Sequence, residues 1–515
     1  MSGGGSITRR TVFKGAALLG GGVLLGAGGI AAATPLLRSD RPALTHGVAS
    51  GDVNGGSAVI WSRADRDATM WVELSLRPDF GDSWQVRGPE MIADNDYTGK
   101  TPVDGLPEGA VVHYRVWADN GAAGEPVAGS LRTAPAEGQD VRFVWSADIA
   151  GQGWGINPDF GGYRTFDDMA ALDPDFFLCS GDYYYGDNPL SETVELPDGR
   201  IWKNLVTPEK AKVAETLDEF RGQYKYNLED GPLRSFLSKV PMINQWDDHE
   251  VLNNWYPGEI HDDDNYTEKN VDVLAARARK AFAEYTPNPM GPDGEGRIYR
   301  KISHGPLLDV FVLDMRTYKD PNTLNDSPDG GTVLGRTQLD WLKRELADST
   351  AAWKVIANDL PLGLIVGDGP ENIEAVAQRD NGSPLGREVE IAELLSYVKA
   401  QSIAGIVWIT ADVHYTAAHH YDPSRAAFTD FNPFWEFVAG PLNAGSFGPG
   451  KLDATFGAEA VFHKAPDADH QGANPLDGYQ FYGEIAVDAA SKTLTARLLE
   501  IGGAELFRQE LTADS

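Results

Sequence analysis

Ionisable side chains are concentrated in one short stretch of the chain, residues 245–254, which reads Gln-Trp-Asp-Asp-His-Glu-Val-Leu-Asn-Asn. An apolar run at 240–243 leads directly into it, and the four ionisable residues 247–250 follow that run. A buried strand that ends in carboxylates and an imidazole is energetically costly unless these groups bind something. A metal ion is the simplest explanation, so the stretch predicts a metal site.

The same pattern, an apolar run followed by polar chemistry, recurs along the chain after residue 140. Open α/β sheets form their binding sites at the carboxyl ends of strands, so we expect these residues to form one polar crest. A single aspartate at a strand end more often makes a turn or caps a helix, but six in series favour a metal centre. The runs and the residues after them are 141–145 with Asp148, 176–179 with Asp182, 240–243 with Asp247, Asp248 and His249, 307–313 with Asp314 and Arg316, 353–357 with Asn358 and Asp359, and 405–410 with Asp412 and His414.

The residue types in this crest suit hard, oxygen-seeking metal ions. Asp182 follows a glycine and could bridge two ions, while Asp248 and His249 offer one oxygen and one imidazole. Asp412 and His414 are two residues apart, so an extended segment points both to one side. Such ligands favour Ca²⁺, Mn²⁺, Fe³⁺ or Zn²⁺ over copper. A dinuclear site generates hydroxide near neutral pH and holds both oxygens of an in-line displacement.

Two more residues each have two interpretations. Tyr185 lies three residues after Asp182 and could supply a phenolate ligand, which favours ferric iron, whereas three tyrosines in a row usually pack in a core. Arg316 lies at a strand end and is suited to hold a phosphoryl oxygen. The alternative for Arg316 is an ion pair with Asp314.

Composition excludes several classes of partner. Lys and Arg number 44 and Asp and Glu 76 among 515 residues, which gives a net charge of −32. Nucleic acids and anionic membranes attract basic surfaces, so we expect no nucleic-acid binding and no tight adsorption to such membranes. Cys179 is the only cysteine in the sequence, so no intrachain disulfide can form. The length provides for a large core and two domains.

The first 33 residues have the pattern of a twin-arginine signal peptide. Arg9 and Arg10 precede a weakly apolar run, residues 15–33, that contains seven glycines and ends in three alanines. The glycines argue against the alternative of a membrane anchor, and the alanines favour cleavage after Ala33. We therefore expect export by the twin-arginine machinery to the periplasm or the medium, with no stable membrane anchor after cleavage.

The residue pattern in the rest of the chain predicts two domains. Residues 41–134 contain short β-branched and aromatic runs separated by turn residues, which predicts an N-terminal β-sandwich. Residues 140–515 alternate between strand and helix patterns and end in three strand-like runs after residue 480. We expect helices at 165–172, 208–224, 271–285, 337–347 and 391–401.

Longer motifs surround these residues. They are His-Gly-Val-Ala-Ser-Gly-Asp at 46–52, Gly-Asp-Tyr-Tyr-Tyr at 181–185, Trp-Asp-Asp-His-Glu-Val at 246–251 with Asn-Asn at 253–254, Leu-Asp-Met-Arg-Thr-Tyr at 313–318, Gly-Arg-Thr-Gln-Leu-Asp-Trp-Leu at 335–342 and Asp-Val-His at 412–414. With these motifs the chain resembles the alkaline phosphatase D (PhoD-like) family of calcineurin-like metallophosphoesterases. The resemblance implies an α/β fold, a four-layer αββα metallophosphatase sandwich, after an N-terminal all-β immunoglobulin/fibronectin-like domain.

The resemblance also implies a chemistry. It implies Fe³⁺ with Ca²⁺, with Mn²⁺ or Zn²⁺ as alternatives, and hydrolysis of phosphomonoesters or phosphodiesters, including phospholipase D-like activity. Carried over to this sequence, Asp182 bridges the metals, Tyr185 is the phenolate on iron, and His249 is the site histidine. One departure concerns the first strand end, where many members have a cysteine and this chain has Asp148. A carboxylate is a harder ligand than a thiolate, so this departure bears on which metal the site binds and which substrate it accepts.

We therefore predict an exported, metal-dependent phosphoesterase that acts on monoesters, diesters or both by attack of a metal-bound hydroxide. Its substrate is a small phosphate ester, with a lipid headgroup as an alternative. The alternative functions are a phospholipase D-like phosphodiesterase and a catalytically silent binding protein on the same fold. The loops 186–200 and 443–475 are expected to decide the ester class. The predicted metal ligands are Asp148, Asp182, Tyr185, Asp248, Asp412 and His414, and the predicted catalytic residues are His249 and Arg316.

Overall fold

The computed structural model describes residues 41–291 and 294–513. The predicted signal peptide, residues 1–33, lies outside the described residues. Within the described ranges, no helix combines the length and the apolar character needed to cross a membrane.

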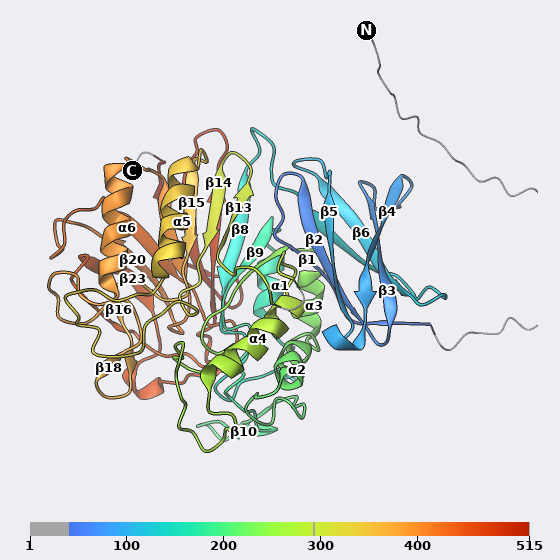
Figure 1. The fold of residues 1–515 in the computed structure, drawn as a ribbon, viewed down its shortest axis with the longest axis horizontal. Helices are drawn as coiled ribbons and strands as arrows, with labels where there is room; N and C mark the ends of the chain where they lie inside the picture. Colours follow the sequence, from blue (N-terminus) through green and yellow to red (C-terminus); the bar gives the residue numbers. More distant parts are fainter. Residues whose placement is uncertain (1–40, 292–293, 514–515) are drawn as a thin grey trace, which may run out of the picture. The chain divides into compact units, whose positions relative to one another are not determined.

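The first seven strands pack face to face around one apolar core (blue in Figure 1). In β6, Val112, Tyr114 and Val116 are buried while the residues between them are partly exposed, the period-two pattern of a half-buried strand. This confirms the predicted all-β fold class of the N-terminal part. The strands are β1 (Leu44–Gly51), β2 (Ser57–Ala64), β3 (Ala68–Ser75), β4 (Ser83–Met91), β5 (Thr98–Asp104), β6 (Val111–Asp119) and β7 (Val127–Arg132).

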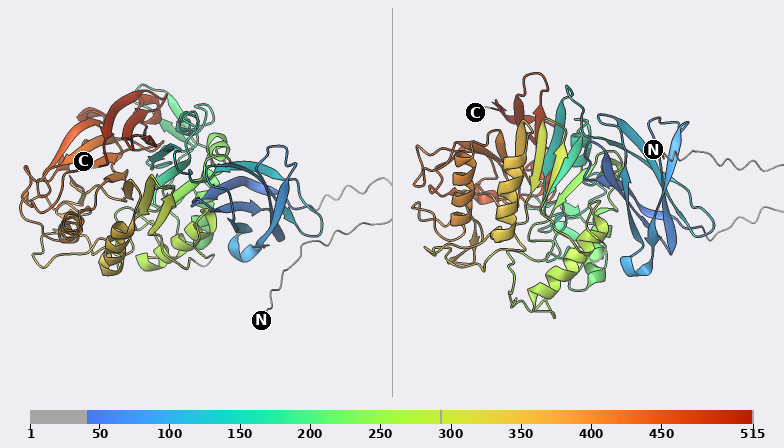
Figure 2. Two further views of the ribbon diagram at one scale, coloured as in Figure 1. Left: turned by 90° about the horizontal axis from the view of Figure 1, so that it is seen from above. Right: turned by 45° about the horizontal axis from the view of Figure 1, so that its top comes forward.

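The first large sheet has nine strands in the order β26-β25-β24-β8-β9-β12-β1-β2-β5. Strands β8, β9 and β12 are parallel, and β24 to β26 form the antiparallel meander predicted for the end of the chain. Gly51 of β1 pairs with Met242 of β12, so the sheet continues into the N-terminal strands, which lie beside it in Figure 2. The strands not yet bounded are β8 (Val141–Ser146), β9 (Phe176–Ser180), β12 (Met242–Gln245), β24 (Phe481–Val487), β25 (Leu494–Glu500) and β26 (Glu505–Leu511).

The second large sheet has seven strands in the order β13-β14-β15-β19-β21-β20-β23. Its centre is parallel, as expected for strands that alternate with helices. The strands are β13 (Arg300–His304), β14 (Leu308–Val312), β15 (Trp353–Ala357), β19 (Ile406–Thr410), β20 (Thr416–Tyr421), β21 (Phe434–Val438) and β23 (Ala458–Lys464).

Alternating side chains of each sheet face two different apolar layers. Phe143 and Trp145 of β8 pack toward the second sheet, whereas Val144 packs with the helices on the other side. Likewise Val355 of β15 faces the first sheet and Ile356 faces α5 and α6. The order helix, sheet, sheet, helix confirms the predicted αββα sandwich. The helices are α1 (Thr165–Ala170), α2 (Leu217–Asn227), α3 (Gly231–Leu237), α4 (Val271–Tyr285), α5 (Gly335–Asp348) and α6 (Glu388–Ala400).

One predicted helix was placed too early in the chain. Residues 208–216 form turns and irregular structure, and α2 starts only after Thr216. The Thr216 hydroxyl accepts a hydrogen bond from the Glu219 backbone, and the Glu219 carboxylate accepts one from the Thr216 backbone. This capping box fixes the start of the helix, and the prediction overlooked it.

Candidate metal centre

Four strand ends bring the predicted crest together. Asp148 follows β8, Asp182 follows β9, Asp248 follows β12, and Asp412 follows β19 of the second sheet. Strands β8, β9 and β12 are parallel neighbours, so their carboxyl ends lie at the same edge. The two sheets therefore supply one site, as the series of strand ends predicted.

Three groups of acids and histidines converge in this crest. Within each group, the potential ligand atoms all lie within 4.8 Å of one another. Asp182 belongs to two groups and Asp248 to two, and shared carboxylates are what a site with more than one ion requires. The groups are Asp148, Asp182 and His414; Asp182, Asp248 and His249; and Asp247, Asp248 and Asp412.

The backbone of the crest is strained at its functional residues. Asp148, Asp182, Asp412 and His414 have φ angles of 59°, 46°, 63° and 58°, in the left-handed region that non-glycine residues rarely adopt. Such conformations persist only where the surrounding structure enforces them, and they cluster at active sites. Four of them at the ends of three strands turn the side chains inward to a common point.

Neighbouring Gly181 lets the chain turn without a clash. Its φ is +97°, and a Cβ atom there would lie 2.4 Å from the Cβ of Asp247. Glycine is therefore required on two counts, the backbone angle and the space.

The carboxylates of the crest repel one another when no cation is bound. Burial, followed by the charges of Asp248, Asp247 and Asp148, raises the pKa of Asp182 well above its ordinary value. Burial and the charges of Asp247 and Glu374 likewise raise the pKa of Asp412. Groups that resist ionisation in this way are typical of functional sites.

Several oxygens of the crest have the properties expected of metal ligands. Asp148 Oδ2, Asp247 Oδ2 and Asp248 Oδ1 are buried and have no hydrogen-bond partner among the described residues. Buried polar atoms are nearly always paired. Unpaired carboxylate oxygens, converging with histidine nitrogens, fit hard metal ions.

Both histidines present Nε2 to the carboxylates. His414 Nδ1 donates to the carbonyl oxygen of Gly445 at 2.5 Å, and His249 Nδ1 is hydrogen-bonded to Asp187 Oδ1 at 2.8 Å. Outer partners of this kind fix the orientation of a ligating or catalytic imidazole. Burial lowers the pKa of His249, but the charges of Asp187 and Asp248 outweigh burial and raise it to about 9.

Tyr185 points into the crest and is not ordinary core packing. Its hydroxyl lies 2.9 Å from His414 Nε2 and 3.3 Å from Asp148 Oδ1. Its ring stacks on the His249 imidazole with a centroid distance of 4.0 Å. The structure thus places the phenol oxygen among the predicted ligands, while Tyr183 and Tyr184 pack in the apolar core.

Arg316 lies beneath the crest, fully buried, and its ion pairs differ from the alternative expected from the sequence. Its Nε donates to Asp247 Oδ1 at 2.5 Å and its Nη1 donates to Glu374. Among the described residues, the contact between Asp314 and Arg316 is a hydrogen bond from the Arg316 backbone and not an ion pair with its guanidinium. The third nitrogen, Nη2, has no hydrogen-bond partner in the described part of the chain and lies 3.5 Å from Asp412 Oδ1.

Three supporting acids were not identified from the sequence. Glu250 accepts hydrogen bonds from the backbone of Asp182, Tyr183 and Asp247, and so fixes both turns. Asp187 holds His249, and Glu374 holds Arg316 and Lys319. Glu250 could have been found from the run of four ionisable residues at 247–250, but no local pattern marks Asp187 or Glu374.

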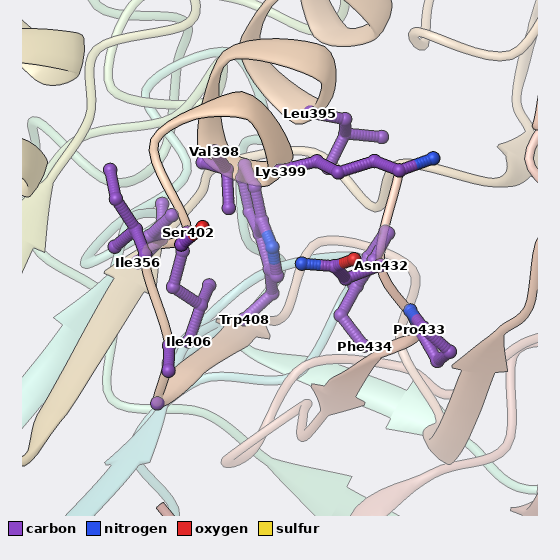
Figure 3. Close-up of a pocket in the computed structure, with 13 residues that line it drawn as sticks. Ile356, Leu395, Val398, Lys399, Ser402, Ile406, Trp408, Asn432, Pro433 and Phe434 are labelled. Atoms are coloured by element: carbon purple, nitrogen blue, oxygen red, sulfur yellow. The ribbon is translucent and has the colours of Figure 1, made fainter. Parts of the chain in front are cut away.

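The cavity shown in Figure 3, about 470 Å³ in volume, lies elsewhere. It is bounded by Leu395 and Val398 of α6 and by residues at the amino ends of β19 and β21. The crest follows the carboxyl end of β19. None of the lining residues is an acid, a histidine or a cysteine. The cavity is therefore not the metal centre.

Comparisons with known proteins place the chain among phosphatases. The family model for the PhoD-like phosphatase matches residues 143–498, and the model for the PhoD-like phosphatase N-terminal domain matches residues 30–135. Alkaline phosphatase D of Bacillus subtilis (strain 168) is 28% identical over 436 residues, which cover 79% of this chain and 70% of that protein.

Solved structures share the fold. The structure of PhoD is similar with a TM-score of 0.68 and 22% identity, over 91% of this chain and 89% of that one. A purple acid phosphatase, PPD1 of yellow lupin (Lupinus luteus) seeds, is similar with a TM-score of 0.57 and 12% identity, over 92% of this chain and 76% of that one. Since the PhoD-like phosphatase model covers most of the sequence and the alkaline phosphatase D match extends along it, the chain belongs to the PhoD-like phosphatase family and is a phosphoric ester hydrolase.

Proposed function

We propose that this hydrolase is exported and depends on a metal site of at least two ions, and that it cleaves small phosphate esters. The observation that carries the proposal is the position of Asp182, whose carboxylate belongs to two converging groups of ligands. A bridging carboxylate is the feature that distinguishes a multinuclear site from a single ion in a polar pocket.

The donor set supports iron with calcium as the metals. Asp148, Asp182, Tyr185 and His414 would hold a ferric ion, because a phenol oxygen lies within 3.3 Å of two of the other donors. The oxygens of Asp248 and Asp412 would hold calcium, with manganese or zinc as alternatives. When bound, the metals supply Lewis acidity toward the phosphoryl group and a nucleophile from water near neutral pH.

Two residues of the chain would act on the substrate itself. The Nη2 group of Arg316 has no hydrogen-bond partner among the described residues, and it can donate to an equatorial phosphoryl oxygen. His249 can deliver a proton to the leaving oxygen from Nε2, because Asp187 holds Nδ1 and, against burial, the charges of Asp187 and Asp248 raise the pKa of His249 to about 9 in the metal-free protein. Asp187 keeps the imidazole in the required orientation.

Export by the twin-arginine route is part of the proposal and rests on the leader. Arg9 and Arg10, followed by a glycine-rich apolar run, support it. This route carries folded proteins, so the metal centre would be assembled before export.

The metals are tested by elemental analysis of protein exported through its own leader, together with a visible spectrum. Iron and calcium with a broad charge-transfer band that disappears in Tyr185→Phe would support the assignment. Two divalent ions and a colourless protein would contradict ferric iron, and would mean that Asp148 has changed the specificity of the site. Hydrolysis of 4-nitrophenyl phosphate and of bis(4-nitrophenyl) phosphate, measured on the same sample, separates monoester from diester use.

A further inference from the structure

Lys210 is a buried lysine that the site described above does not use. Its side chain is 1% exposed, and its Nζ donates to the carbonyl oxygen of Tyr185 at 2.7 Å. The Nζ group also lies over the ring of Tyr226 at 5.9 Å. Burying a polar amine costs free energy that a local packing role could avoid with an apolar side chain. A function for this buried donor is therefore expected.

The segment that Lys210 holds is the one that orients His249. The Lys210 side chain binds the carbonyl of Tyr185, and its own carbonyl accepts from the backbone of Leu190 at 2.8 Å. Both ends of the segment 185–190 are therefore hydrogen-bonded to Lys210. Between them, the Gly186 backbone donates to the carbonyl of His249 at 2.8 Å.

Two side chains of this segment contact the imidazole. Asp187 Oδ1 is hydrogen-bonded to His249 Nδ1 at 2.8 Å, and its Oδ2 accepts from the Asn253 backbone at 2.8 Å. The Tyr185 ring covers one face of the same imidazole at 4.0 Å. Burial lowers the pKa of Lys210 to about 7, and the negative charge of Asp187 opposes that shift. The Nζ group can donate to the Tyr185 carbonyl in either protonation state. The contacts of Asp187 and Tyr185 with the His249 imidazole therefore depend on the position of residues 185–187.

We propose that Lys210 is a positioning residue for proton donation by His249, acting through Tyr185 and Asp187. The inference rests on the proposed role of His249 as the acid that protonates the leaving oxygen. If Lys210 acts through that acid, its loss slows esters with poor leaving groups, which need the proton, far more than esters whose leaving group departs as an anion. A merely structural role slows both kinds of ester equally.

The test compares phenyl phosphate with 4-nitrophenyl phosphate in the metal-loaded, full-length enzyme. We expect Lys210→Met to lower kcat for phenyl phosphate at least about tenfold, and kcat for 4-nitrophenyl phosphate no more than about threefold, with KM within about twofold. Asp187→Asn should show the same selectivity. The double variant should be about as slow as Asp187→Asn alone, because both changes act on one pathway. Metal content should stay unchanged.

Lys354→Met is the matched control. Lys354 is also buried, at 7% exposure, and its Nζ also donates to a backbone carbonyl, that of Ala351, at 2.7 Å. It lies at the start of β15, so its loss should leave both esters unaffected. Lys210→Gln, which keeps a donor near Tyr185, replaces Lys210→Met in the comparison of the two esters if the methionine variant does not fold.

The outcomes separate the inference from the proposed function. Equal losses on both esters, additive losses in the double variant, or no loss in Lys210→Met would overturn the role of Lys210. A wild-type enzyme that hydrolyses neither of these monoesters nor bis(4-nitrophenyl) phosphate would instead overturn the proposed function.

Discussion

Removing the charge of Asp182 should stabilise the metal-free protein while it destroys the enzyme. Asp182 has the carboxylates of Asp148 and Asp248 and the imidazoles of His249 and His414 within 4.8 Å. At an effective dielectric constant of about 20, each pair of unit charges at that distance interacts by about 3.5 kcal/mol. With His249 charged and His414 uncharged, two repulsive pairs exceed one attractive pair, which leaves a net repulsion of about 3.5 kcal/mol.

Protonation relieves part of this repulsion, since the pKa of Asp182 is raised well above its ordinary value. We therefore expect Asp182→Asn to raise the free energy of unfolding of the metal-free protein by about 1 to 3 kcal/mol. The variant keeps the Oδ1 that accepts from the His249 backbone at 3.1 Å. For a chain of 515 residues, an unfolding entropy of about 2.1 cal/mol/K per residue converts this gain to a Tm increase of about 1 to 3 °C.

The assay is scanning calorimetry after chelation at neutral pH, repeated with metals restored. Metals should raise the Tm of the wild type and not that of Asp182→Asn, and kcat/KM should fall by at least about 10³. Asp314→Ala is the control, because the Asp314 carboxylate accepts from Trp246, Arg316 and Thr317 and its removal leaves these donors unpaired. If metal-free Asp182→Asn melts below the wild type, as Asp314→Ala should, the argument from charge repulsion is refuted.

Three further predictions follow from the same structure. Burial, together with the charge of Asp453, raises the pKa of Glu388 from 4.5 to about 8, so the folded protein holds a proton that the unfolded chain releases. The free energy of unfolding should therefore fall as pH rises from 4.5 to 8. Glu388→Gln should reduce the fall measured by urea titrations at pH 5 and pH 8, and an equal fall in the wild type and the variant would contradict this prediction. Gly181→Ala should lower kcat more than tenfold, because its Cβ would lie 2.4 Å from Asp247. Gly258→Ala is the control: its φ of +81° is similar, but no atom lies within 4 Å of the added Cβ, so it should keep full activity. Equal activities of the two variants would show that the space at Gly181 is unimportant. Asp148→Cys should raise the ratio of zinc to iron found by elemental analysis, because a thiolate is a softer ligand, and an unchanged ratio would exclude Asp148 from the ligand set.

Much of the crest was predictable because it depends on local sequence. An apolar strand followed by an acid is visible in any single segment, and Asp148, Asp182, Asp248 and Asp412 were found in this way. The convergence of the strands follows from the geometry of parallel sheets. The boundaries of the N-terminal and catalytic domains, at 134 and 140, stay a prediction.

What the sequence did not reveal are partners that are distant in the chain. Glu374 reaches Arg316 from 58 positions away, and Asp187 reaches His249 from 62. Both are acids in loops, where charged residues are common, so nothing local distinguishes them. Lys210 was hidden for the same reason, and the segment around it had been assigned to a helix because the capping box at Thr216 was overlooked.

The pairing of Gly51 with Met242 bears on how this protein can be dissected. Strand β12 carries Asp248 at its end, and β1 covers one side of it. A fragment that begins after the N-terminal strands would leave β12 as an exposed edge, with open backbone donors and acceptors that invite pairing with other chains. The N-terminal strands therefore protect an edge of the catalytic sheet against aggregation, and the two parts are best expressed as one chain.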